Sequence, residues 1–181
     1  MDEKTRVAVF VDGSNLFYMQ KGVLGWFIDL EKLLFHIEEE YGHIEDAYYY
    51  VSQAGPSEAK QKSFLESIPS MGYSLYTKTV KEIREEDGSI RYKANLDIEI
   101  VLDMFNTIDN YDMAVLVSGD GDFDRALQLL RARGKRFKVI STKGCVAKEL
   151  RSTAGRHYID VMTLKDYLYR RPYSPDTESH S

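Results

Sequence analysis

Short apolar runs, rich in β-branched and aromatic residues, alternate along the chain with segments of helical periodicity. Turn-forming and polar residues separate them, which is typical of buried strands joined by helices. Strands are expected at residues 7–11, 47–51, 73–80, 113–117 and 137–140, and a short sixth strand is possible at 158–161. Helices are expected at residues 29–41, 56–71, 95–108, 123–133 and 146–153.

This alternation of strands and helices predicts an α/β fold, a Rossmann-like three-layer sandwich in which helices cover both faces of a parallel sheet. Right-handed crossovers favour the strand order 3-2-1-4-5. Asp29 is placed as the N-cap of its helix. The polar segment 81–93 contains a turn signal and is expected to form a hairpin or a mobile flap. We expect one domain over residues 1–170 and a disordered tail at 171–181.

Aspartates follow two of the predicted strands directly. Asp12 comes after the first strand and Asp120 after the fourth. In the strand order 3-2-1-4-5 these two strands are neighbours, and their carboxyl ends border the ligand crevice. Asp97 shares the apolar stripe of the helix at 95–108 and is therefore expected to point inward. The three carboxylates should converge, about 4–7 Å apart if they share a cation.

Crowded carboxylates stay ionised together when a hard divalent cation, Mg²⁺ or Mn²⁺, neutralises them. Such a cation activates water for attack on a phosphodiester. Without it, we expect the pKa of at least one carboxyl group to be raised, because like charges lie close together. A buried hydrogen bond at the helix end would be an alternative role for Asp97.

The neighbouring polar residues each have a structural and a functional interpretation. Asp12 could be a turn residue, and Asn15 could cap a helix or orient a water or the scissile phosphate. Asp122 is either the N-cap of the helix at 123–133 or a further ligand. Asp124 is interpreted as a solvated residue or an outer group of the site, and Ser118 as a donor to a carboxylate or as the end of its strand.

Composition removes several classes of protein. The chain has 181 residues and a single cysteine, Cys145, which excludes an internal disulfide and a Cys-rich zinc site. Its four histidines show no metal-ligand spacing. No apolar stretch approaches the roughly 20 residues of a membrane span, so no membrane association is expected and the cytoplasm is the expected compartment.

Charge is distributed unevenly along the chain. Residues 1–124 carry 11 Lys and Arg against 24 Asp and Glu, whereas residues 125–171 carry 13 against 3. A basic stretch directly after an acidic cluster is suited to hold a polyanion beside it, although a solvated surface is the plain alternative. The residues expected to contact RNA phosphates are Lys93, Lys143, Lys148 and Arg151. Tyr18 and Trp26 could stack on bases, and burial in the core is favoured for Trp26.

Three segments, VFVDGSNLFY, KANLDIEIVLDMFN and VLVSGDGDFDRALQLL, resemble the NYN branch of the PIN-like nuclease superfamily, and within it the LabA-like proteins. The resemblance spans roughly residues 6–168 and implies a PIN-like sandwich with a Mg²⁺- or Mn²⁺-dependent endoribonuclease site. Its acidic residues fall on Asp12, Asp97, Asp120 and Asp122, and its asparagine falls on Asn15. LabA-like proteins are associated with regulatory roles in bacteria.

The leading hypothesis is therefore a metal-dependent endoribonuclease that leaves a 5′-phosphate and a 3′-hydroxyl. The second is a non-catalytic RNA-binding or regulatory signalling module on the same fold, acting through a protein partner or as a homodimer. An aspartyl-phosphate phosphatase or receiver is less favoured, because Ser14 stands where the phosphatase needs a second acid. The glycine spacing of a dinucleotide-binding loop is missing after the first strand.

Overall fold

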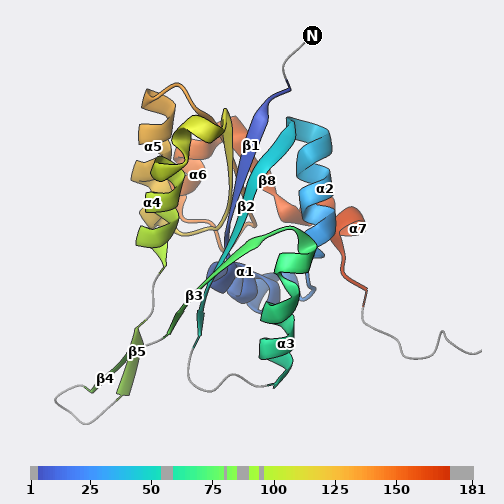
Figure 1. The fold of residues 1–181 in the computed structure, drawn as a ribbon, viewed down its shortest axis with the longest axis vertical. Coiled ribbons are helices and arrows are strands. Elements are labelled where there is room, and N and C mark those ends of the chain that lie inside the picture. The colour runs from blue at the N-terminus through green and yellow to red at the C-terminus, as the bar shows by residue number, and fades with distance from the viewer. Residues whose placement is uncertain (1–3, 54–58, 80, 85–89, 94–95, 172–181) are drawn as a thin grey trace, which may run out of the picture.

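A six-stranded sheet, in which all neighbouring strands are parallel, forms the middle layer of the computed structural model (Figure 1). The structure describes residues 4–53, 59–79, 81–84, 90–93 and 96–171. The strand order is β3-β2-β1-β6-β7-β8. Because β4 and β5 form a separate sheet, the strands of this sheet numbered in chain order follow 3-2-1-4-5-6. The predicted order is confirmed, and the sixth strand, β8, lies at the edge beside β7. The strands are β1 (Arg6–Asp12), β2 (His43–Gln53), β3 (Ser74–Thr79), β6 (Met113–Val117), β7 (Arg136–Ser141) and β8 (Tyr158–Asp160).

Helices cover both faces of this sheet, as Figure 1 shows. One face packs against α1, α2 and α7 and the segment after α3, and the other against α4, α5 and α6. The helices are α1 (Gly13–Met19), α2 (Leu30–Tyr41), α3 (Ala59–Ser67), α4 (Asp97–Asn106), α5 (Asp124–Ala132), α6 (Lys148–Ala154) and α7 (Lys165–Leu168). A π-helical segment η1 (Gln20–Leu24) extends α1, and a 3-10 turn η4 (Gly121–Phe123) precedes α5.

Burial on both faces explains why β1 reads as a continuous apolar run. Val7, Val9 and Val11 belong to one core cluster, whereas Ala8 and Phe10 belong to the other. Successive side chains of a strand point to opposite faces, so a central parallel strand needs apolar residues at every position.

Several element boundaries differ from those predicted. β2 begins at His43, four residues earlier than expected, because its polar first residues still pair with the start of β1 through a register shift. The helix expected at 56–71 is α3 followed by the 3-10 turn Pro69–Met71, with Pro56 outside the described residues. The helix α1 with its π-helical extension occupies a segment to which the periodicity assigned no element.

The polar segment 81–93 forms a hairpin in its described parts. β4 (Lys81–Arg84) pairs antiparallel with β5 (Ile90–Lys93) in a separate two-stranded sheet. The turn at 87–88 and most of the tail at 171–181 lie outside the described residues. Within the described ranges, no helix is both long enough and apolar enough to cross a membrane.

Candidate metal centre

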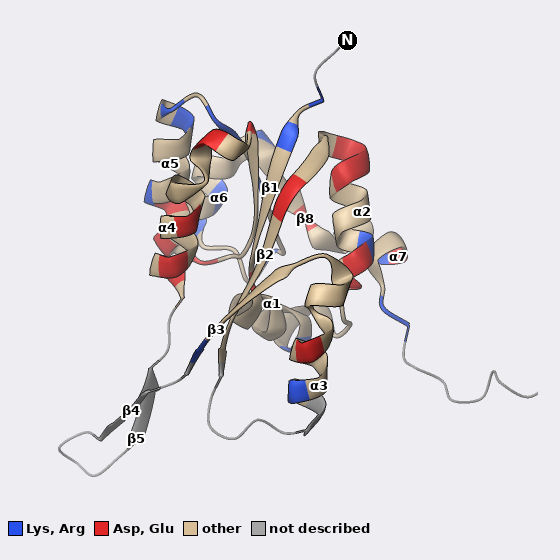
Figure 2. Cartoon of the chain, viewed as in Figure 1, with Lys and Arg blue, Asp and Glu red and all other residues tan. Residues whose placement is uncertain are grey.

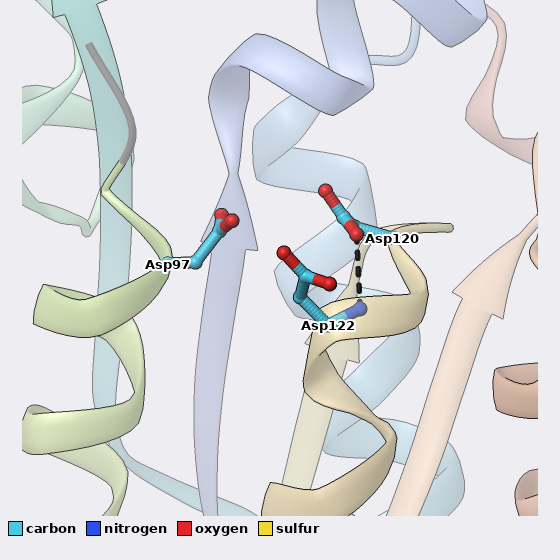
Figure 3. A group of neighbouring side chains, drawn as sticks. All are labelled: Asp97, Asp120 and Asp122. Carbon is cyan, nitrogen blue, oxygen red and sulfur yellow. Dashed lines mark hydrogen bonds between the residues drawn. The ribbon is translucent and has the colours of Figure 1, made fainter.

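Three carboxylates converge at the carboxyl ends of the central strands. Asp97 is the first residue of α4, Asp120 lies in the loop after β6, and Asp122 lies in η4. One oxygen from each lies within 4.8 Å of the others, and Figure 3 shows the three side chains reaching toward a common space from two sides. The inward orientation predicted for Asp97 places its carboxylate in this group.

Asp12 is a buried carboxylate that hydrogen bonds connect to this group. It ends β1 beside β6, and only 7% of its surface is exposed. One of its oxygens accepts the Asn15 backbone N–H at 3.0 Å, which makes Asp12 the N-cap of α1. The other accepts the Ser118 hydroxyl at 3.0 Å, and Ser118 Oγ in turn accepts the Asp120 N–H at 3.1 Å. Asp12 is therefore linked to Asp120 through Ser118, but it is not one of the three residues within 4.8 Å.

The pKa of Asp12 is raised from 3.8 to about 6. Burial is the largest cause, and the negative charges of Asp97 and Asp120 add smaller contributions. The hydrogen bonds from Asn15 and Ser118 act in the opposite direction. The expectation of a raised pKa is confirmed, but desolvation contributes more than repulsion between the carboxylates.

The capping role considered for Asp122 belongs to Asp120 instead. Asp120 accepts the Asp122 backbone N–H at 3.0 Å and is the N-cap of η4. The 3-10 turn comes before the α-helix, so α5 begins at Asp124. Its N-cap position is Phe123, which makes no side-chain capping bond. The carboxylate of Asp122 is left exposed at the candidate metal centre. Asp124 is half-buried, and one of its oxygens accepts the Gln128 amide at 2.8 Å.

Asn15 connects α1 to the loop that carries Asp120. Its side-chain oxygen accepts the Gly119 N–H at 2.9 Å, and it does not cap the helix. The Gly119 carbonyl accepts the Ala147 N–H at 2.8 Å on the other side of the loop. A Cβ at Gly119 would overlap the Cys145 carbonyl, so the close approach of these two loops requires glycine.

One acidic neighbour was missed by the sequence patterns. A Cβ at Gly121 would overlap the Glu149 carboxylate, so Glu149 of α6 lies against the turn between Asp120 and Asp122. Glu149 stands within the basic stretch of the sequence, and no motif includes it. The packing of α6 on η4 brings Glu149 to this turn.

The basic residues differ in their position and in their partners. Figure 2 shows Lys and Arg on α5 and α6, whereas α4 carries acidic residues. Lys143 and Lys148 are exposed, and Lys148 follows the residue that bonds to Gly119. The Arg151 guanidinium lies 4.2 Å from the Tyr158 ring centroid and donates to a backbone carbonyl at 3.0 Å. Lys93 ends β5, and its side chain is outside the described part of the chain.

The sequence matches the NYN domain family over residues 6–164, and the chain belongs to this family. NYN domains are PIN-like nuclease domains that act on RNA. The chain is 42% identical to the Low amplitude and bright protein LabA of Synechococcus elongatus over 167 residues, which cover 91% of this chain and 88% of that protein.

A solved structure shares the fold. The crystal structure of a protein of unknown function, VPA0982 from Vibrio parahaemolyticus, superposes with a TM-score of 0.73. The match covers 93% of this chain and 98% of the other, at 24% sequence identity. At this identity the likeness establishes the fold alone.

Proposed function

We propose that this protein is a metal-dependent endoribonuclease whose cation is held by Asp97, Asp120 and Asp122, with buried Asp12 linked to Asp120 through Ser118. The observation that carries this proposal is the approach of three carboxylate oxygens to within 4.8 Å of one another, at the carboxyl ends of the sheet. Membership of a nuclease family supports the same reaction class.

The three side chains suit a hard divalent cation. Mg²⁺ and Mn²⁺ prefer carboxylate oxygens, and two oxygens on one Mg²⁺ lie at most about 4.2 Å apart, given a bond length of about 2.1 Å. The observed limit of 4.8 Å needs only a small rotation of one side chain. Three negative charges at close range also explain why the site would favour a cation over any neutral ligand.

When bound, the cation would supply Lewis acidity that activates water and stabilises negative charge on the phosphate. The protein's own residues hold the geometry. Asp12 and Ser118 fix the Asp120 backbone, and Asn15 fixes Gly119 beside it. The amide oxygen of Asn15 already accepts the Gly119 N–H. We therefore assign Asn15 the role of holding the loop after β6, in addition to the expected role of orienting a water or the scissile phosphate.

The basic residues are proposed to hold the RNA backbone. Lys143 and Lys148 are exposed in the segment that packs on the Asp120 loop, so they can contact phosphates of an RNA strand bound near this loop. Arg151 is the weaker candidate of the three, because its guanidinium already has partners within the protein.

The decisive experiment compares cleavage by the wild type and by Asp120→Asn. An asparagine can still accept the Asp122 N–H as an N-cap, so the turn is kept while one ligand charge is removed. We expect the wild type to cut single-stranded or hairpin RNA with Mg²⁺ or Mn²⁺ and not in EDTA. Asp120→Asn should show no detectable cleavage but should still bind RNA.

Asp166→Asn is the control, since Asp166 is exposed on α7, which packs on the face of the sheet opposite α4 and α5. It should cleave at the wild-type rate. If the wild type cuts none of these RNAs with either cation, the nuclease proposal is wrong. Retained RNA binding would then favour the non-catalytic module.

A further inference from the structure

Two large aromatic side chains are exposed on α1, the helix that begins at Asp12. Tyr18 is 68% exposed and Phe17 is 52% exposed, whereas Leu16 and Met19 are buried in the core. The buried residues fix the helix on the sheet, so the exposed rings are held on a rigid support. An exposed ring of this kind can accept a flat partner without a large loss of conformational freedom.

Helix geometry places Tyr18 on the side of α1 that carries Ser14 and Asn15. At about 100° per residue, Tyr18 lies about 40° from Ser14 and about 60° from Asn15 around the helix axis, between the two. Ser14 Oγ lies 3.1 Å from Ser52 Oγ on β2, and Asn15 bonds to Gly119. Both contacts lie at the carboxyl ends of the strands. Tyr18 thus projects from the same side of α1, about 9 Å along the axis from Asp12.

Positive charge lies beside this aromatic pair. A Cβ at Gly22 would lie 3.8 Å from the Tyr18 ring, an ordinary contact distance, so Gly22 lies next to this ring. Lys21 Nζ lies 5.1 Å from the Phe17 ring centroid. Val23 lies 3.8 Å from the position of a Cβ at Gly144, which brings exposed Lys143 to the end of the same helical segment.

We propose that Tyr18 is a stacking platform for an unpaired nucleobase of the RNA strand held at the carboxylates. The inference rests on the proposed function and names its substrate class as single-stranded RNA. Aromatic rings bind single strands because every base has an open π-face, whereas the bases of a duplex are already stacked on their neighbours. Lys21 beside Phe17 and Lys143 at the end of the helical segment supply contacts to the phosphates, which a purely apolar partner would not use.

The test measures binding in EDTA, so that it does not depend on cleavage. Fluorescence anisotropy would follow a short single-stranded oligoribonucleotide and a duplex of the same length. A separate single-stranded oligoribonucleotide that carries 2-aminopurine would report stacking, because stacking on an aromatic ring quenches the fluorescence of this base. The variants are Tyr18→Ala, Tyr18→Trp and the control Phe35→Ala. Phe35 is 57% exposed on α2 and lines a hollow with Thr5 and Gly42. These two residues precede β1 and β2, so the hollow lies at the amino ends of the strands, away from the carboxylates.

Loss of one stacked base should weaken single-strand binding by about 5- to 150-fold in Tyr18→Ala. Tyr18→Trp should keep both affinity and quenching, and Phe35→Ala should bind like the wild type. Duplex binding should not change in any variant. Equal affinities of Tyr18→Ala and Phe35→Ala for the single strand would overturn the inference, as would an equal loss for duplex and single strand.

The two proposals fail separately. A wild type that binds single strands through Tyr18 but never cleaves them would contradict the nuclease and leave the stacking platform standing. A wild type that cleaves RNA while Tyr18→Ala binds and cleaves normally would keep the nuclease and remove the platform.

Discussion

The buried carboxylate of Asp12 should make the metal-free protein less stable as the pH rises. The pKa of this group is raised from 3.8 to about 6, so the folded state disfavours its ionised form. For an acid, stability is then greatest below pH 3.8 and is lost as the pH rises through about 6. At about 1.4 kcal/mol per pH unit, the ionised group destabilises the folded protein by about 3 kcal/mol above that pH.

Asp12→Asn isolates this contribution because the two side chains have nearly the same size. The amide oxygen can still accept the Asn15 N–H, and asparagine caps helices as well as aspartate does. The amide NH₂ must face Ser118 Oγ, which already accepts the Asp120 N–H, and this costs about 1 kcal/mol. The variant should therefore be more stable than the wild type by about 2 kcal/mol near pH 7.5, or roughly 4–8 °C in Tm.

The assay is urea and thermal unfolding in EDTA between pH 4.5 and pH 8. The stability difference between variant and wild type should shrink toward pH 4.5, because Asp12 is then protonated in the folded protein and its buried charge is gone. Added Mn²⁺ should narrow the difference at pH 7.5, because a cation offsets the negative charge of the group. Asp122→Asn, an exposed carboxylate at the same site, serves as the control. A variant that is less stable than the wild type at pH 7.5, or a difference that does not vary with pH, would refute the reasoning.

Two further predictions concern the surroundings of the metal centre. Replacing Lys143 and Lys148 with glutamine should weaken RNA binding. In a salt titration, the slope of log K against log salt should fall by about 0.7 per lost phosphate contact. An unchanged slope would mean that both lysines only face solvent. Gly119→Ala should destabilise the protein by about 1–3 kcal/mol, because its Cβ would overlap the Cys145 carbonyl. Urea unfolding of Gly119→Ala measures this cost, and wild-type stability would show that the two loops can separate freely.

Local pattern was enough to predict the sheet. Apolar runs such as Met113–Val117 are buried on both faces, and only strands inside a parallel sheet need apolar residues at every position. Right-handed crossovers left few arrangements, and the doubly wound order predicted among them is confirmed. The segment after β1 was different. Its helix α1 is short and exposes Phe17 and Tyr18, so its sequence has no clear helical stripe.

Residue spacing alone was enough to predict that Asp12, Asp97 and Asp120 stand at strand and helix ends. Their hydrogen bonds and their distances from one another depend on the folded structure. The Ser118 hydroxyl and the Asn15 N–H donate to the two oxygens of buried Asp12, while Asp122 lies beside Asp97 and Asp120. The reason is that residue spacing fixes which side chains reach one edge of the sheet, whereas hydrogen bonds between loops distant in sequence fix which oxygens remain free to face a cation.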